Sequence, residues 1–172
     1  MKQYAFVIEL DRCIGCKGCQ VACKMENGTA LGSDRIKVRT VGPTGIYPNL
    51  EMYFMPTMCQ QCENPVCVRV CPSGAVYKSR EDGIIRIETK KCIGCHSCAM
   101  ACPYGIPSFG ENGKMIKCDG CYIRVHHGML PACVKACPVK ALQLVDTEAK
   151  EPQIPPEHSL RMTSAGMLKQ QV

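Results

Sequence analysis

The residues of this chain best suited to bind metals are its sixteen cysteines, which fall into four groups of four. A thiolate is a soft ligand that favours zinc, copper and iron–sulfur clusters. Four thiols in each group, with no cysteine left over, therefore indicate four metal centres. In chain order the groups are Cys13, Cys16, Cys19 and Cys23; Cys59, Cys62, Cys67 and Cys71; Cys92, Cys95, Cys98 and Cys102; and Cys118, Cys121, Cys133 and Cys137.

The spacing within the groups distinguishes among these metals. The third group reads C-x2-C-x2-C-x3-C and is followed by Pro103, which is the run that binds [4Fe–4S] clusters in bacterial ferredoxins. The second group adds two residues to the middle of this run, and the fourth stretches its middle to eleven. The first keeps the tight spacing but has Lys24 where the proline would stand. The simplest interpretation is four [4Fe–4S] clusters.

The run also has a physical logic. A C-x2-C-x2-C loop supplies three converging thiolates, and Gly15 and Gly94 stand where the backbone must turn tightly. We expect the fourth cysteine to begin a helix, with the following proline in its first turn. The fourth thiol would then point away from its own loop and bind the other cluster of a pair, as in two-cluster ferredoxins.

Three other uses of these cysteines are weaker. A disulfide framework suits the cysteine density, but cysteines two residues apart in series are poor disulfide partners, and the chain shows no signal peptide. A four-cysteine zinc site usually joins two separated pairs. Cys92 to His96 matches the C-x-x-C-H haem-attachment motif, but haem attachment would leave Cys98 and Cys102 without a role and break the fourfold pattern.

Composition points to a fold that depends on its metal. The chain has three Phe, six Tyr and no Trp, so its apolar core is thin, and we predict that the cluster-free chain does not fold. The formal charge is +6, but four thiolate-bound clusters add about −2 each and bring the sum to about −2. The excess of lysine and arginine over acidic residues thus gives no support for nucleic-acid binding. Several lysines near the cysteines are candidate local counter-charges: Lys17, Lys24, Lys90, Lys91, Lys114, Lys117, Lys135 and Lys140.

Several functional classes find no support. No apolar run approaches the ~20 residues of a membrane span, and the N-terminus shows neither a signal pattern nor twin arginines, so we expect no membrane crossing and no export signal of its own. There is no G-x-G-x-x-G or P-loop. His126 and His127 lie between Cys121 and Cys133 without an acidic or serine partner in a recognisable sequence motif, so a substrate site on this chain has little support.

The segments around the cysteines predict how the groups are positioned. Residues 4–9 and 141–145 read as strands, one before the first group and one after the last. Residues 75–78 and 84–87 flank Glu81-Asp82-Gly83 and predict a hairpin between groups two and three. Residues 35–41 and 50–54 predict a second hairpin, with its turn at the Gly-Pro-Thr-Gly of 42–45.

We therefore predict an α+β fold of two ferredoxin-like 2[4Fe–4S] modules, one inserted into the other. The outer module comprises residues 1–23 and 103–146, with groups one and four. The inner module comprises residues 59–102, with groups two and three. Residues 24–58 form a β-hairpin insertion, and residues 147–172 form an extended or partner-bound tail.

The whole pattern resembles the four-cluster electron-transfer (beta) subunit of the molybdopterin oxidoreductases related to dimethyl sulfoxide reductase. The resemblance covers roughly residues 3–146. It is carried by CIGCKGC from Cys13, CQQCENPVC from Cys59, CIGCHSC from Cys92 with ACPYG from Ala101, and KCDGCY from Lys117.

The resemblance implies a crossed ligand assignment, in which the last cysteine of each group binds the other cluster of its module. The implied ligands are Cys13, Cys16, Cys19 and Cys137 for cluster 1; Cys23, Cys118, Cys121 and Cys133 for cluster 2; Cys59, Cys62, Cys67 and Cys102 for cluster 3; and Cys71, Cys92, Cys95 and Cys98 for cluster 4.

The resemblance also implies partners. The outer module would face a molybdopterin (Mo or W) catalytic subunit, and the inner module an integral-membrane, quinone-linked anchor. The chain would be membrane-associated through these partners, on the outer face by co-export with a twin-arginine partner or on the cytoplasmic side. It would transfer electrons without catalysing a reaction itself. The alternatives are a free-standing polyferredoxin that carries electrons between soluble enzymes and a zinc-bound structural adaptor.

Overall fold

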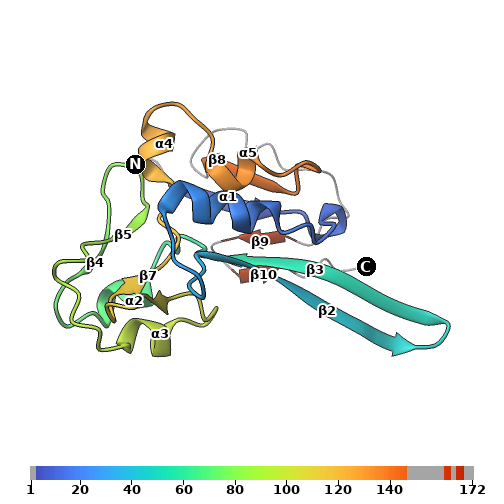
Figure 1. Cartoon of the computed structure of the whole chain (residues 1–172), viewed down its shortest axis with the longest axis horizontal. Helices are drawn as coiled ribbons and strands as arrows, with labels where there is room; N and C mark the ends of the chain where they lie inside the picture. Colours follow the sequence, from blue (N-terminus) through green and yellow to red (C-terminus); the bar gives the residue numbers. More distant parts are fainter. Residues whose placement is uncertain (1–2, 147–160, 164–165, 169–172) are drawn as a thin grey trace.

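The computed structural model describes residues 3–146, 161–163 and 166–168, and it mixes short helices with two-stranded sheets. Figure 1 shows helix α1 beside α5 and β8, while α2, α3, β4 and β5 lie on another side of the molecule. The long hairpin of β2 and β3 projects away from both (Figure 1). The predicted tail, residues 147–172, falls mostly outside the described residues. The part of it that the structure describes is Arg161–Thr163 (β9) and Gly166–Leu168 (β10), which form an antiparallel pair.

The strand β1 (Tyr4–Ile8) pairs antiparallel with β8 (Leu142–Asp146), in a register that runs from Tyr4 opposite Asp146 to Ile8 opposite Leu142. Both strands agree with the predicted segments to within one residue. Because group one follows β1 and group four precedes β8, this pairing brings two distant cysteine groups to the same end of the ladder. The helices α1 (Gly18–Asn27) and α5 (Ala132–Lys135) pack against each other beside it.

The predicted local hairpin is confirmed. The strand β4 (Val76–Lys78) pairs antiparallel with β5 (Ile85–Ile87) around the Glu81-Asp82-Gly83 turn. The helices α2 (Val66–Arg69) and α3 (Ser97–Ala101) pack together beside this hairpin. The remaining short elements are η1 (Leu10–Arg12), β6 (Ser108–Phe109), β7 (Met115–Ile116) and α4 (Tyr122–His126).

The projecting hairpin differs from its prediction at the turn. The strand β2 (Ile36–Ile46) runs straight through the expected Gly-Pro-Thr-Gly turn and pairs with β3 (Asn49–Met58), so the chain reverses at residues 47–48. Gly42 and Pro43 instead lie in a bulge of β2, where the register shifts between Val41 and Thr44. Gly42 has a φ of +105°, and a Cβ there would lie 2.5 Å from the carbonyl oxygen of Glu51, so the strands approach too closely for a side chain.

The apolar core is divided into two clusters. The larger one joins β1, β8 and the base of the β2–β3 hairpin through Phe6, Ile8, Ile36, Met58 and Leu142. The smaller one lies under the β4–β5 hairpin. Both clusters include cysteine side chains, so the apolar core and the metal-binding thiols share the same interior. Within the described ranges, no helix combines the length and apolar character that a membrane crossing needs.

Candidate metal centres

The cysteine loops of groups one and three have the same backbone path. Gly15 and Gly94 have φ values of +68° and +70°, as the sequence predicted for tight turns between ligands. Lys17 and His96 follow in the left-handed region and are the N-cap residues of α1 and α3. The helix therefore begins next to the third cysteine of each group. The expectation that the fourth cysteine begins a helix is wrong.

The proline was also assigned the wrong role. Cys102 is the C-cap of α3, so Pro103 follows the end of that helix, where a residue that cannot continue a helix is common. Pro72 and Pro138 likewise follow the ends of α2 and α5. Group one has Lys24 at this position, and α1 continues to Asn27. The proline is therefore a helix terminator, and its absence explains why α1 is the longest helix described.

The direction of the fourth thiol follows from helix geometry. Cys19 and Cys23 are four residues apart on α1, and both are buried. Residues at this spacing lie one above the other on the same helix face. Cys23 is thus displaced by one helical turn from the loop that holds Cys13 and Cys16, and it points at a neighbouring site.

The thiols assigned to cluster 1 come together across the β1–β8 ladder. Burial raises the pKa of Cys19 to about 11, and the nearby charges of Cys13, Cys137 and Cys16 add to the rise. Such charge interactions need short distances. The amide of Ala141, next to β8, donates a hydrogen bond of 3.2 Å to the sulfur of Cys137.

The thiols assigned to cluster 2 are the most deeply buried. Burial raises the pKa of Cys133 to about 12, followed by the charges of Cys121 and Cys23. Burial also raises the pKa of Cys118, with Cys59 and Cys133 as the next causes. Cys59 is assigned to cluster 3, so clusters 2 and 3 would be adjacent.

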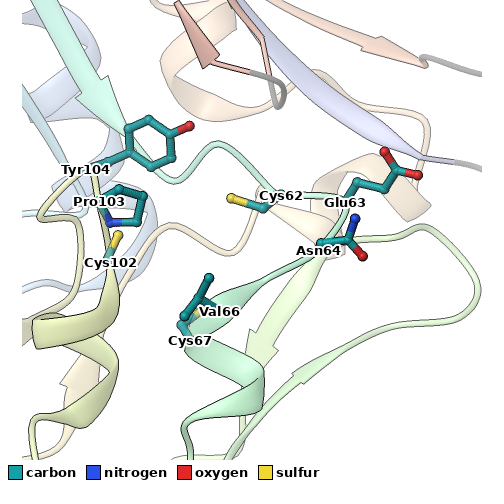
Figure 2. A pocket seen from close by; sticks show the side chains of 8 residues that line it. All are labelled: Cys62, Glu63, Asn64, Val66, Cys67, Cys102, Pro103 and Tyr104. Atoms are coloured by element: carbon teal, nitrogen blue, oxygen red, sulfur yellow. The ribbon is translucent and has the colours of Figure 1, made fainter.

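Three thiols assigned to cluster 3 line one cavity of about 330 Å³: Cys62, Cys67 and Cys102. Figure 2 shows the sulfurs of Cys62 and Cys102 turned toward the same space, with the Tyr104 ring beside them. Cys59, the fourth thiol of this assignment, is the second cause, after burial, of the rise in the pKa of Cys67 to about 11.

The four thiols assigned to cluster 4 line another cavity, beneath Met115 and Phe109: Cys71, Cys92, Cys95 and Cys98. Burial raises the pKa of Cys71, but hydrogen bonds from the Val76 amide and the Ser73 hydroxyl outweigh it and lower the pKa overall. His96 stacks on Phe109 with ring centroids 3.7 Å apart. This histidine is thus an exposed N-cap residue whose ring stacks on a neighbouring aromatic ring.

The donor set fits an iron–sulfur cluster. All sixteen cysteines are free thiols. Within the part of the chain that the structure describes, no three Cys, His, Asp or Glu side chains converge tightly enough for one metal ion. The thiols assigned to clusters 3 and 4 line cavities, which suits a group of several atoms.

Comparison with known proteins agrees with this chemistry. Two family profiles, each described as a 4Fe-4S dicluster domain, match residues 12–75 and 50–147. The B component of the anaerobic dimethyl sulfoxide reductase of Escherichia coli K12 is 45% identical over 148 residues, covering 81% of this chain and 72% of the relative. This protein belongs to the same iron–sulfur subunit family.

Two further relatives extend the family. The B component of the anaerobic dimethyl sulfoxide reductase of Haemophilus influenzae is 42% identical over 151 residues, covering 83% of this chain and 73% of the relative. The B component of the tetrathionate reductase of Salmonella typhimurium is 41% identical over 138 residues, covering 78% of this chain and 54% of the relative. With two dicluster domains and sixteen cysteines, the cofactor complement of this iron–sulfur subunit is four [4Fe–4S] clusters.

Polar groups around the clusters were harder to find from the sequence. In this iron–sulfur subunit, backbone amides donate to ligand sulfurs, including Gly120 to Cys118 at 3.4 Å and Met115 to Cys92 at 3.5 Å. Hydrogen bonds to cluster sulfurs are one determinant of reduction potential.

Sequence reasoning also missed Gln61, which has a φ of +49° and is fully buried. One signal was available. Aligning the C-Q-Q-C of group two with the C-I-G-C and C-D-G-C of the other groups places Gln61 where they have glycine.

Proposed function

We propose that the chain relays single electrons through four [4Fe–4S] clusters, between a molybdopterin (Mo or W) catalytic subunit and a quinone-linked membrane anchor or another redox partner. The proposal includes the crossed ligand assignment for clusters 1 to 4 and the division into outer and inner modules. It also holds that the chain catalyses no substrate reaction by itself. The coarser assignment, an iron–sulfur electron-transfer subunit, follows from family membership.

The observation that carries the proposal is the order of the four thiol sets. Clusters 1 and 2 would be joined by α1, which carries Cys19 and Cys23. Clusters 2 and 3 would meet where Cys118 and Cys59 interact. Clusters 3 and 4 would be joined by the α3 segment, which carries Cys98 and Cys102. A single path with two ends is the arrangement that a one-electron relay needs.

The two ends of this path are also the places where cysteines reach the surface. Cys16 of cluster 1 and Cys95 of cluster 4 are the two exposed cysteines of the sixteen. Exposed apolar side chains stand beside each: Ile14 and Val21 near Cys16, and Ile93 and Met100 near Cys95. Exposed apolar patches mark protein interaction sites, which supports one partner docking at each end.

Family resemblance supports the choice of partners. We place the catalytic subunit at the cluster 1 end and the anchor at the cluster 4 end. Membrane association would then come through partners, on the side of the membrane where the catalytic subunit resides.

Anaerobic purification from the native host tests the proposal. Iron and sulfide analysis should find about sixteen of each per chain, and native mass spectrometry should find a large pterin-containing partner. A chain with four clusters that elutes alone, as a stable monomer, would instead support the free electron carrier. A colourless, iron-free but folded chain would overturn both functions.

A further inference from the structure

Lys117 is a buried cation at the junction between the two proposed modules. It immediately precedes Cys118 and is 2% exposed. Lysine is almost never fully buried unless it is paired, because removing an ammonium from water is costly. The position of this charge therefore calls for a compensating interaction.

The direct partners of Lys117 are carbonyl groups. Its Nζ donates a hydrogen bond of 2.7 Å to the carbonyl oxygen of Cys118 and another to the carbonyl oxygen of Ile85 on β5. Among the residues that the structure describes, no carboxylate forms an ion pair with it. The two carbonyls accept from two of the three ammonium donors and leave the positive charge without a carboxylate partner among the described residues.

Lys117 lies where the cysteine loops assigned to the two central clusters meet. It precedes Cys118, assigned to cluster 2. The same Cys118 carbonyl that accepts from its Nζ also accepts from Gln61, which lies in the loop between two cysteines assigned to cluster 3. Lys117 is thus close to a cysteine loop of each central cluster. A thiolate-bound [4Fe–4S]2+ centre carries about −2 and gains another negative charge on reduction.

Gln61 keeps this junction in place. Its Oε1 accepts a hydrogen bond of 2.8 Å from the Ile85 amide, and its Nε2 donates one of 3.3 Å to the Cys118 carbonyl. Gln61 and Lys117 therefore bridge the same two residues, from the loop between Cys59 and Cys62 on one side and the group four loop on the other. With both carbonyl partners fixed, the ammonium has little freedom to move away from the thiols.

We propose that Lys117 is a positioning residue of the electron relay, whose fixed positive charge raises the reduction potentials of the two central clusters above the values they would otherwise have. The inference rests on the proposed ligand assignment of clusters 2 and 3. Because reduction adds negative charge, a nearby buried cation stabilises the reduced form of each cluster. An electron would then meet a smaller uphill step at the middle of the path.

The test is an EPR-monitored redox titration of the full, cluster-loaded chain, purified anaerobically with any partners it retains. The variants are Lys117→Met, which removes the charge, and Lys117→Arg, which keeps it. Lys91→Met is the matched control. Lys91 also precedes the first cysteine of a group, but it is exposed and pairs with Glu88 at 2.7 Å. Serine replacement of Cys121 and of Cys102 assigns the signals of clusters 2 and 3.

At a fixed potential near the wild-type midpoints, Lys117→Met should lower the ratio of reduced to oxidised central clusters by about tenfold, which is about 59 mV for a one-electron couple. Clusters 1 and 4 should change by less than about threefold, since their distance from Lys117 weakens the interaction. Lys117→Arg and Lys91→Met should leave the central pair within about threefold of wild type.

Three results would overturn the inference: central potentials unchanged in Lys117→Met, equal shifts in all four clusters, or a Lys117→Arg shift as large as that of Lys117→Met. If Lys117→Met loses the central clusters, retention of all four by Lys117→Arg supports the role of charge, and their loss there refutes it. Failure of the proposed function would show separately, because the wild-type chain would then not give four one-electron couples with these ligands.

Discussion

The two proposed modules of this chain are stabilised in different ways. In the outer module, β1 and β8 form a ladder of five residue pairs between segments from opposite ends of residues 3–146. A ten-residue helix, α1, lies beside this ladder. In the inner module, β4 and β5 form three pairs within one local hairpin, and α2 and α3 have four and five residues. Strand pairing and apolar packing thus contribute more to the outer module, and metal–thiolate bonds must contribute more to the inner one.

The difference shows how a small chain can assemble four metal centres. Local contacts form more readily than distant ones, because a short loop costs less entropy to close. The inner hairpin is local, so it can bind its clusters with little other structure. The outer module must join residues far apart in sequence, which requires a larger apolar contact.

The largest expected effect is that of iron removal. We expect the cluster-free chain to unfold, because metal binding supplies folding energy that its thin core lacks. During stepwise anaerobic chelation, amide hydrogen exchange should rise first in residues 66–101 and last in residues 4–8 and 142–146. A cluster-free chain whose circular dichroism matches the loaded form would contradict the prediction.

A matched pair of core substitutions compares the modules directly. Ile8 in β1 is 0% exposed and Ile85 in β5 is 1% exposed. We expect Ile8→Ala to lower the free energy of unfolding by about 4 kcal/mol and Ile85→Ala by about 2 kcal/mol, because the larger outer core loses more contacts. Anaerobic urea unfolding followed by circular dichroism measures both. Equal losses of unfolding free energy would mean that the two cores contribute equally to stability, which contradicts the prediction.

A proline placed in group one tests the exception among the four groups. Lys24→Pro should destabilise the fold by about 3 kcal/mol, since it removes a helical hydrogen bond and interrupts α1. Lys24→Ala is the control, because it keeps the helix and removes only the side-chain contacts, including the 2.9 Å ion pair with Asp34. The control should cost about 1 kcal/mol or less. Thermal loss of the visible iron–sulfur absorbance ranks the two, and equal losses would show that the length of α1 is unimportant.

The smallest expected effect concerns a contact between the modules. Buried Asp82, in the inner hairpin, lies 2.9 Å from Nε2 of His126 on α4. A double-mutant cycle with Asp82→Asn and His126→Gln should give a coupling free energy of about 0.5 to 1 kcal/mol, because the histidine is partly exposed. A coupling free energy of zero would show that this pair does not help hold the modules together.

Local sequence patterns predicted the local structure well. The strands near residues 4–9 and 141–145, the 76–87 hairpin and the tight turns at Gly15 and Gly94 are all present. The errors came from residues whose role depends on what lies opposite them. Gly42 and Gly45 look like a turn in sequence, but Gly42 lies in a bulge and Gly45 is paired with Leu50 of the facing strand. The proline after each x3 cysteine was assigned to the wrong end of a helix, because spacing alone does not show where the helix begins.

The sequence by itself determined the number and chemistry of the metal centres, since sixteen thiols in ferredoxin spacing have few other uses. Only the tertiary structure decided which loops meet. The electrostatic interaction of Cys59 with Cys118, and the hydrogen bond from buried Gln61 to the Cys118 carbonyl, join segments more than fifty residues apart. Ligand type and spacing are properties of short segments, whereas the electrostatic environment of a cluster is created by whatever the fold packs around it.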